Sequence, residues 1–424
     1  MPNALQTSTL ITNEVLAIAH NNSAFLGRMN TDYDGAWDGK YAPGATLKAR
    51  RPVQFTVRSG AVANIQDITD STVDITVQPE LGIDFAVSNY ELATAVRNDG
   101  NVDSAFRERY LKPAGMRIAA ELDYRIAAAV KNSVYNFVGT PGTGPSTLAD
   151  VMAMHTPLDN QATPRDGMRY VALTPLAHNT VVGGLSGIFN DQKTIGEQYK
   201  TGSIKTALGF DFVMSQNLPT HTVGPLGGTP LVNGANQGLI NSGATDNPYA
   251  ATTSLVTDGW TAAAAARLNA GDVFTIAGVF SVNPETKQST GSLQQFVVTA
   301  NTSSDGSGNA TIVISPAIIA GGAFQNVTAR PADNAALTIQ TGSASTGYAQ
   351  NLVWHKNAVT FVSPKQELPG GMDMAYTASM ADEGGISLRF VRGFDITNNR
   401  FISRFDILWG VAATKPEWLV RRTA

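Results

Sequence analysis

Hydrophobic and polar residues change their spacing several times along this chain, and each change predicts a different kind of element. Between residues 45 and 88 apolar residues alternate with polar ones, a period of two that predicts a long β-hairpin or a small sheet. The alternating apolar positions are Val53, Phe55, Val57, Val73, Ile75, Val77, Ile83, Phe85 and Val87. Ahead of this region, residues 1–40 form an arm in which one face of a short helix carries Leu10, Ile11, Val15 and Ile18.

Residues 103–138 change to a helical period. The apolar stripe consists of Ile118, Leu122, Ile126, Val130, Val134 and Phe137. Pro113 and Gly115 mark the start of the helix, and the turn-rich sequence GTPGTGPST follows its end. We predict a helix over Ala114–Phe137, about 35 Å long at the usual rise of ~1.5 Å per residue.

Residues 146–220 and 349–424 resemble each other in their strand content. In the first segment MRYVALTP predicts a buried strand, LAHNTVVGGLSGIF a helix, and GFDFVMSQNLP a further strand. The second segment contains the strand-like runs LVWHKNAVTFVSP, ISLRFVRGFD and SRFDILWGVAATKPEWLV. We therefore predict that the two segments are halves of one interrupted domain.

The intervening residues 222–348 differ from both halves in composition. From Thr222 to Gly271 only Asp246, Asp258 and Arg267 are charged. Short alternating runs recur as VFTIAGV, QQFVVTA, ATIVISP and ALTIQTG, and the first lies in GDVFTIAGVFSVNPETKQ, whose central VNPET predicts a hairpin turn. This pattern predicts an inserted small antiparallel barrel or sandwich.

Composition limits the classes of function. Only 15% of the residues are charged, against roughly 25% in a typical soluble domain, which favours surfaces that partners cover. The net charge is −4 and there is no long basic run, so tight gripping of nucleic acid is not expected. Cysteine is absent, which excludes disulfides and thiolate chemistry. No basic start and no apolar run of about 18 residues occurs, so we expect neither a secretory signal nor a membrane span.

No catalytic constellation is evident in the sequence. The five histidines, at positions 20, 155, 178, 221 and 355, match no metal-ligand spacing. The glycine that a nucleophile elbow needs two residues after its serine is missing after Ser186, where Ile188 stands, and no phosphate-binding loop occurs. The stretch 30–41 begins like a calcium loop with Asn30, Asp32 and Asp34, but Tyr41 occupies the position of the bidentate glutamate. We expect a structural protein without catalytic residues, cofactor or metal.

The order of elements resembles a known family. GDVFTIAGVFSVNPETKQ with LQQFVVTA, GFDFVMSQNLP, and RFDILWGVAATKPEWLV are similar to segments of the major coat proteins of tailed bacteriophages. These have the α+β Hong Kong 97-like capsid fold, and the insert resembles that of the short-tailed Salmonella phages.

The resemblance implies one role for each part of the chain. It implies an N-terminal arm at 1–40, an extended hairpin loop at 41–88, a peripheral domain with a spine helix at 89–145, an axial domain and β-hinge at 146–221 and 349–424, and a β-barrel insertion domain at 222–348. It also implies hexamers and pentamers of the chain, scaffolding, portal and decoration proteins as partners, and assembly in the bacterial cytoplasm into a virion capsid. The shell would enclose double-stranded DNA without binding it specifically.

Contacts between subunits are the sites to expect in such a protein. Our candidates are Arg50, Arg51, Arg107, Arg109, Asp246, Arg421 and Arg422. In the family, charged pairs from an insertion-domain loop meet across a two-fold axis, but INSGATDNPYAATTS holds only Asp246. Two alternatives stay open: the shell of a bacterial nanocompartment, and a secreted β-rich carbohydrate-binding protein that uses Trp260, Trp354 and Trp409.

Overall fold

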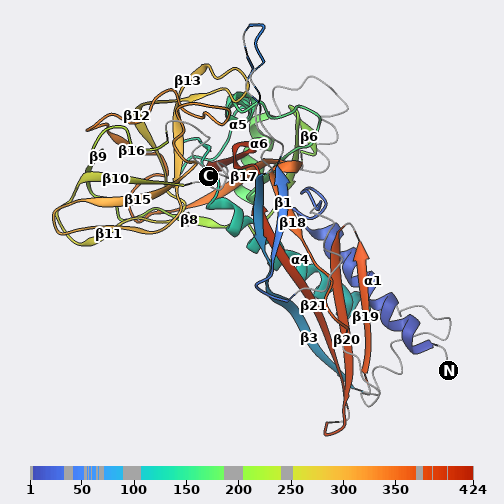
Figure 1. Ribbon diagram of the computed structural model, residues 1–424. Coiled ribbons are helices and arrows are strands. Elements are labelled where there is room, and N and C mark those ends of the chain that lie inside the picture. The colour runs from blue at the N-terminus through green and yellow to red at the C-terminus, as the bar shows by residue number, and fades with distance from the viewer. Residues whose placement is uncertain are drawn as a thin grey trace. The chain divides into compact units, whose positions relative to one another are not determined.

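The computed structural model of the chain combines helices and sheets (Figure 1). It describes residues 3–32, 42–51, 71–88, 107–185, 204–239, 252–368, 376–383, 385–398 and 400–423, and single positions between 55 and 65. The chain divides into two compact units. Unit 1 contains Met1–Ala49, Asp74–Ile126 and Thr360–Ala412, and unit 2 contains Arg50–Val73, Ala127–Val359 and Ala413–Ala424.

Unit 1 is built on a five-stranded sheet in which β21 (Arg400–Ala413) is the longest strand. The other strands are β3 (Gln78–Ser88), β18 (Val359–Val362), β19 (Tyr376–Glu383) and β20 (Ile386–Asp395). β20 and β3 pair antiparallel with β21. Phe405 of β21 lies with its ring centroid 5.9 Å from that of Phe85 and 4.8 Å from that of Phe390. The strand predicted from ISLRFVRGFD is confirmed as β20, and the first part of SRFDILWGVAATKPEWLV, residues 403–413, lies in β21.

The alternation between residues 45 and 88 belongs to two different sheets. β1 (Thr46–Arg51) pairs with β2 (Ser71–Thr76) in a two-stranded sheet. Phe55 and Val57, where the alternation predicted a strand, lie in no strand, and Val53 lies outside the described residues. The last part of the pattern, residues 83–87, lies instead in β3 and pairs with β21. Leu47 and Ile75 are fully buried and pack in one cluster with Val362 and Leu408. The sequence shows the period of these strands, but the choice of partner depends on packing far along the chain.

Two helices of unit 1 approach each other closely. α1 (Asn3–Asn22) contacts β19 and β20 (Figure 1) and buries Ile11 and Val15, as its apolar face predicted. η1 (Arg107–Leu111), a π-helix, leads into α4 (Lys112–Lys131). A Cβ on Gly115 of α4 would lie 2.8 Å from Ile18 Cγ2, so only glycine allows this approach.

The predicted extension of α4 to Phe137 is wrong, because the helix ends at Lys131. Asn132 and Ser133 follow, residue types whose side chains compete for backbone hydrogen bonds. Ser133 N donates to Val130 O at 2.9 Å in the closing turn. Phe137 is nevertheless buried, as the apolar pattern indicated, but in strand β4 (Phe137–Val138).

Asp123 of α4 holds the segment that follows α1. Its carboxylate accepts hydrogen bonds from the Ser23 hydroxyl and, at 2.8 Å, from Ala24 N. Ser23 Oγ in turn accepts from Leu26 N at 2.9 Å. Burial raises the pKa of Asp123 to about 6, although the bonds to Ser23 and Ala24 act in the opposite direction.

Unit 2 contains a seven-stranded sheet with the order β4-β22-β17-β5-β7-β6, with β8 also pairing with β17. Besides β4 its strands are β5 (Arg169–Leu173), β6 (Thr206–Ala207), β7 (Phe210–Met214), β8 (Thr220–Thr222), β17 (Gly347–His355) and β22 (Leu419–Thr423). β5 and β7 are the strands predicted from MRYVALTP and GFDFVMSQNLP. The sheet joins strands from both sides of residues 222–348. Residues 360–412 belong to unit 1 instead, and one interrupted domain of 146–220 and 349–424 stays a prediction.

Short helices accompany this sheet. α5 (Leu148–Asn160) begins with a capping box between Thr147 and Asp150, and α6 (Pro175–Leu185) follows β5 as predicted. Two 3-10 helices, η3 (Lys356–Ala358) and η4 (Pro416–Trp418), precede β18 and β22. Met154 and Leu158 of α5 pack against Val171, Val353 and other buried residues of the sheet.

Residues 222–348 contain a six-stranded sheet with the order β16-β12-β13-β15-β10-β9. Its strands are β9 (Gly228–Val232), β10 (Thr253–Trp260), β12 (Val273–Val282), β13 (Ser289–Val298), β15 (Ala310–Ser315) and β16 (Leu337–Ile339). β11 (Ala265–Leu268) and β14 (Thr302–Ser304) form a separate pair. A bridge between Leu231 and Ala336 joins the β9 end of the order to the β16 end. Phe274, Phe296 and Ile312 lie in the core that the strands enclose.

The predicted hairpin of GDVFTIAGVFSVNPETKQ is confirmed as β12 and β13. Asn283 opens the turn: its Oδ1 accepts from Glu285 N at 2.9 Å and from Thr286 N at 3.1 Å. The backbone N of Asn283 donates to Gln288 O at 2.9 Å. An asparagine side chain that bonds the backbone two residues later is a standard turn device.

One side chain of this hairpin reaches the edge of the seven-stranded sheet. Gln295 Oε1 accepts from Phe137 N at 2.6 Å, and Gln295 Nε2 donates to Phe137 O at 2.9 Å. The amide thus takes the place of a neighbouring strand beside β4. Phe137 also packs with Tyr135, Val273 and Val297.

Asp272 joins the beginning and the end of the 222–348 segment. The residue has no exposed surface. Its Oδ1 lies 2.9 Å from His221 Nε2 and 3.1 Å from Thr341 Oγ1. Its Oδ2 accepts from Gly224 N at 3.0 Å and from Asn269 N at 2.8 Å. We call these five residues the Asp272 clasp; it fixes both connections of the segment at one point.

Replacing Asp123 with asparagine should remove one pH dependence of stability. The folded-state pKa of about 6 lies above the ordinary 3.8, so the stabilising contribution is complete below about pH 4 and is lost as pH rises through about 6. The lost contribution is about 3 kcal/mol for a shift of this size. Urea unfolding of the wild type and Asp123→Asn between pH 4 and 7.5 would measure it. Glu121→Gln, at a partly exposed position of α4 where the carboxylate pairs with Arg125, is the control. A wild-type profile as flat as that of Asp123→Asn would contradict the expectation.

Replacing Asp272 with asparagine should destabilise unit 2 by roughly 2–5 kcal/mol, because the new amide group would face donors that need an acceptor. The measurement is the denaturant midpoint of the full chain. Asp305→Asn is the matched control, because Asp305 accepts bonds from Ser307 N and Asn309 N in an exposed turn of the same segment. Equal midpoints for the two variants would show that the clasp contributes nothing.

Candidate functional site

The arginines at the end of β1 lie in different environments. Arg50 is exposed, and so remains a candidate for contact with another molecule. The Arg51 side chain is 2% exposed and forms an ion pair with Glu417 of η4. Arg51 therefore has a role inside unit 2, and its expected contact with another molecule stays a prediction.

Arg107 and Arg109 lie on η1 in unit 1, and both are exposed. Arg107 Nε donates to Glu14 Oε1 of α1 at 2.6 Å, so this arginine links the two helical segments. Asp246 lies outside the described residues. The expected subunit contacts of these three residues stay predictions.

The two arginines of β22 are buried, with exposures of 0% for Arg421 and 2% for Arg422. Arg421 Nη2 donates to Gly271 O at 2.6 Å, beside the Asp272 clasp. Arg422 Nη2 bonds Asp150 Oδ1 at 3.2 Å. Burial lowers the pKa of Arg421 to about 10, while Asp272 acts in the opposite direction. The side chains are occupied within the chain, and a contact with another subunit stays a prediction for both.

The tryptophans that suggested carbohydrate binding are also internal. Trp260, Trp354 and Trp409 are 4%, 1% and 5% exposed. Sugar rings stack on accessible aromatic faces, so these three side chains are not available for such binding. This removes one of the two sequence features behind the carbohydrate-binding alternative; the other is the Gly/Thr/Asn-rich composition of residues 222–348.

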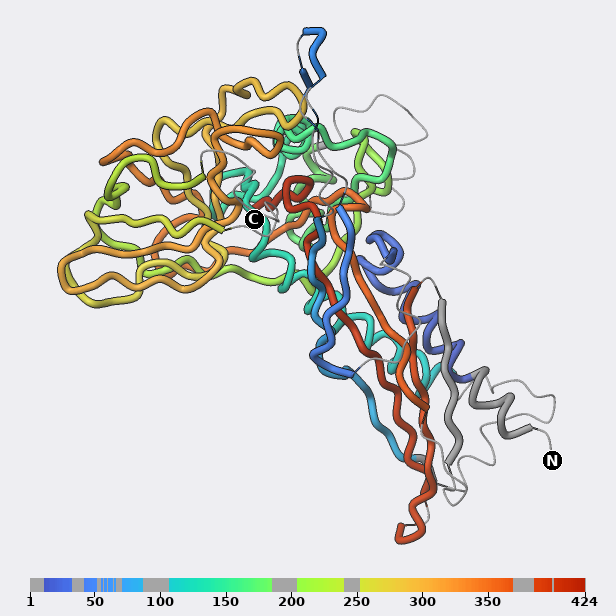
Figure 2. The backbone as a smooth tube through the Cα atoms, in the orientation of Figure 1, coloured from blue at the N-terminus to red at the C-terminus, as the bar shows by residue number. Residues whose placement is uncertain are grey.

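An exposed apolar loop lies between β1 and β2, blue at the top of Figure 2. Val57 is 98% exposed and Ile65 is 92% exposed, and Phe55 and Val62 are also exposed. Arg58 Nη1 bonds the backbone oxygens of Gly60 and, at 3.3 Å, Val62. Large apolar side chains exposed close together in the sequence are typical of interaction surfaces.

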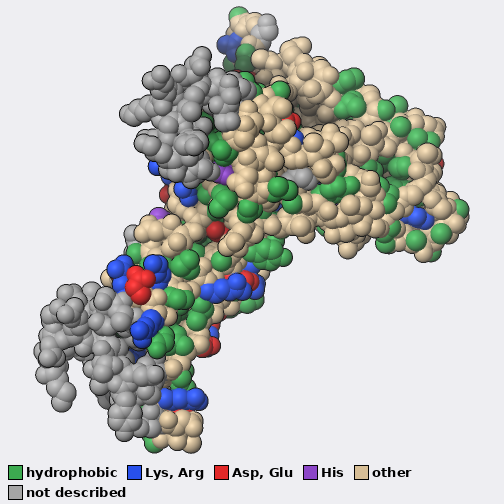
Figure 3. Space-filling model, turned by 180° about the vertical axis from the view of Figure 1, so that it is seen from behind, with side chains coloured by type: hydrophobic (Ala, Val, Ile, Leu, Met, Phe, Trp, Pro, Cys, Tyr) green, Lys and Arg blue, Asp and Glu red, His purple; other side chains and the backbone are tan. Residues whose placement is uncertain are grey.

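The charged side chains on the described surface are unevenly distributed. Figure 3 shows Lys, Arg, Asp and Glu gathered over part of the molecule, whereas the 222–348 segment at the upper right shows few. The sequence shows the same imbalance. A surface poor in charge is suited to contacts that remove water from both partners.

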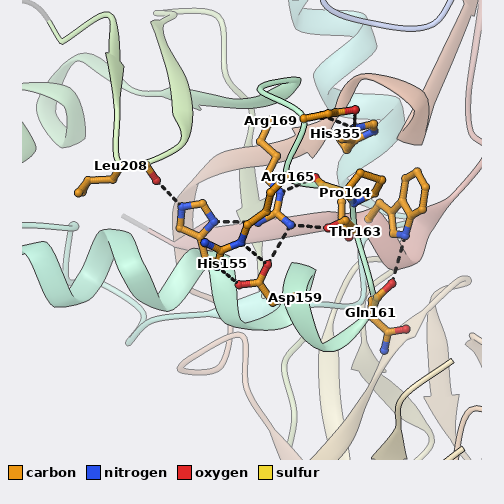
Figure 4. Close-up of polar contacts among 11 residues, drawn as sticks. His155, Asp159, Gln161, Thr163, Pro164, Arg165, Arg169, Leu208 and His355 are labelled. Carbon is orange, nitrogen blue, oxygen red and sulfur yellow. Dashed lines mark hydrogen bonds and ion pairs between the residues drawn. The ribbon is translucent and has the colours of Figure 1, made fainter. Parts of the chain in front are cut away.

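A buried polar network surrounds Arg169 at the start of β5 (Figure 4). Its guanidinium donates to Pro164 O at 3.0 Å, to Thr163 O at 2.5 Å and to Asp159 Oδ1 at 2.9 Å. Arg169 Nη1 also lies 2.9 Å from His155 Nδ1. The side chain is 1% exposed. Arg169 thus shapes the loop that follows α5.

These contacts determine the protonation of His155. Because arginine can only donate, Nδ1 must accept, and Nε2 must donate to Leu208 O at 2.8 Å. The pKa of His155 is lowered, first by burial and also by Arg169. Burial likewise lowers the pKa of His355, whose Nε2 lies 3.1 Å from Asp166 Oδ1. In both residues Nδ1 faces a donor, which favours the neutral ring.

This network has a structural role. Within the described ranges no group of three His, Asp or Glu side chains is placed to hold a metal ion. None of the described helices is both long and apolar enough to span a membrane. The sequence analysis missed Arg169 and Asp272. The sequence did contain a signal for both residues. Each is a single charged residue that directly precedes a mainly apolar run: Arg169 begins RYVAL, and Asp272 begins DVFTI.

No curated protein sequence matches this chain. Among solved structures, it is similar to a chain of Mycobacterium phage Che8, with 13% identity over 94% of this chain and 90% of that chain, and a TM-score of 0.44. A chain of the bacteriophage PhiM1 mature capsid gives 10% identity, 95% and 86% coverage, and a TM-score of 0.40. A chain of a virus-like particle from Pyrococcus furiosus gives 7% identity, 97% coverage of both chains, and a TM-score of 0.38.

The sequence model of one protein family, P22 coat protein (gene protein 5), matches residues 2–420. The match extends through both compact units and across the 222–348 segment. This chain therefore belongs to the P22 coat protein family.

Proposed function

We propose that this chain, a major capsid protein by its family, builds an icosahedral shell from hexamers and pentamers around a phage genome. The match to the coat protein family over residues 2–420 carries the proposal. A shell protein needs large surfaces that exclude water, and the low charged fraction of 15% agrees with that need. A structural family of this kind implies no enzymatic activity.

The proposed fold is Hong Kong 97-like with an inserted β-barrel. We assign the arm to residues 1–40, the extended loop to 41–88, the peripheral domain to 89–145, the axial domain and β-hinge to 146–221 and 349–424, and the insertion domain to 222–348. The Leu231–Ala336 bridge between the two ends of the six-stranded order supports a closed barrel.

The proposed partners follow from the same family membership. A scaffolding protein would guide assembly in the bacterial cytoplasm, and portal and decoration proteins would complete the particle. The net charge of −4 suits a lining that does not grip DNA. A nanocompartment shell of the same fold would differ by enclosing protein cargo.

Electron microscopy of the purified chain, made with and without the scaffolding protein of its phage, tests the function. Closed shells of uniform diameter are the expected result, because one subunit type that makes equivalent contacts generates a closed lattice. A chain that remains monomeric under both conditions would overturn the proposal. Shells filled with protein instead of DNA in infected cells would favour the nanocompartment.

The apolar loop between β1 and β2 should contact a neighbouring subunit. Val57→Asp should leave the unfolding midpoint unchanged, because the side chain is 98% exposed. It should slow shell formation roughly tenfold, the effect of losing one interface anchor. Light scattering during assembly measures the rate. Ser307→Asp adds the same charge at an exposed turn and is the control. Equal assembly rates for the two variants would show that the loop does not contact a neighbouring subunit.

A further inference from the structure

Strand β22 lies inside a sheet although it follows every other strand in the sequence. It pairs antiparallel with β17, from Gln350↔Thr423 to Trp354↔Leu419. On its other side it pairs parallel with β4, with Arg421 opposite Phe137. All five of its residues are buried. Without residues 419–423 this sheet would have a gap between β4 and β17.

The gap has specific chemistry on both faces of the strand. Successive side chains of a strand point to opposite faces. Arg421 bonds Gly271 O at 2.6 Å and reaches Lys131 O at 3.4 Å. Arg422 bonds Asp150 Oδ1 at 3.2 Å and Thr143 O at 3.3 Å. Each buried guanidinium thus meets acceptors from two separate segments.

The backbone around the gap is shaped to the same strand. A Cβ on Gly139 would overlap Arg422 Nη1, and Gly139 has a φ of 94°, so glycine is required there. Asn136 Nδ2 donates to Leu419 O at 2.9 Å, and Arg421 N donates to Asn136 O at 2.8 Å. Val420 packs in the apolar cluster under the sheet. A strand of different sequence could pair with the backbones of β4 and β17, but it would leave the acceptors of the two arginines, such as Gly271 O and Asp150 Oδ1, without a donor.

We propose that the gap between β4 and β17 is a strand-binding site that selects a segment with two aliphatic residues followed by two arginines. Residues 419–423 of the same chain fill the site in the folded protein. While the site is open, during folding, it accepts the same segment from a second copy of this chain. The inference concerns unit 2 alone and does not depend on shell assembly.

Leaving the site empty is costly. Residues Gln350–His355 of β17 are all buried, and their backbone groups toward β22 would lose their partners. Buried backbone groups without hydrogen bonds are strongly disfavoured. Asp150 would also lose the guanidinium of Arg422. These losses favour capture of any matching strand over an open edge.

Refolding of the full chain in the presence of a synthetic peptide tests the site. A fluorescent peptide of residues 415–423 is added in excess when the denatured chain is diluted from urea, and incorporation is measured by size-exclusion chromatography. A matched peptide carries Arg421→Gln and Arg422→Gln. The native peptide should co-elute with the chain, and the variant peptide should do so roughly tenfold less, because it lacks the charge-assisted bonds. Native protein that was never unfolded should take up neither.

Three results would overturn the proposal. The first is equal incorporation of the two peptides, which would mean that the arginines are not selected. The second is uptake by the native protein at the same level as during refolding. The third is recovery of native tryptophan fluorescence without incorporation.

If the chain does not refold from urea, hydrogen exchange on the native chain tests the proposal instead. Amides of residues 419–423 should then exchange as slowly as those of residues 350–355, because they belong to one closed sheet. Exchange as fast as that of the exposed residues Val57, Arg58 and Val62 would contradict a filled internal site.

Discussion

Four hydrogen-bond donors converge on the carboxylate of Asp272, and the arrangement of unit 2 depends on that convergence. A charge with no exposed surface is tolerated only when its acceptor positions are filled. Here the donors come from residues 221, 224, 269 and 341, so the charge can be satisfied only when both connections of the long segment are in place. The neighbouring Arg421 adds the C-terminal strand to the same place through Gly271 O. In a chain without cysteine, such buried polar junctions take over part of the role that cross-links have elsewhere.

Ionisable groups in the two units respond to pH in opposite directions. In unit 1 the raised pKa of Asp123 means that stability is lost as pH rises through about 6. In unit 2 burial lowers the pKa values of His155, His221 and His355 below the ordinary 6.5. Their contribution is present above pH 6.5 and is lost as pH falls, because the unfolded state then binds more protons. No single pH favours both sets of contacts.

Regular alternation along the sequence predicted the strands well, and β5, β7, β12, β13, β20 and β21 lie where the apolar runs indicated. The predicted end of α4 was wrong, because the apolar stripe continues to Phe137, which is buried in strand β4 and not in the helix. The buried arginines could not be predicted, because LVRRT has the pattern of a polar chain end. Two adjacent arginines in a strand must point to opposite faces. Only the folded chain shows that one face offers Gly271 O and the other Asp150. The burial of the three tryptophans likewise depends on elements far away in the sequence.

The side chain of Gln295 has a consequence for the behaviour of the chain at high concentration. A coat subunit is made in many copies in a small volume, and an open sheet edge is where such copies would add to each other without limit. At Phe137 both edge groups of the backbone are occupied by an uncharged amide of the same chain. The edge of β4 at Phe137 is thus closed to a further strand by a side chain that carries no charge.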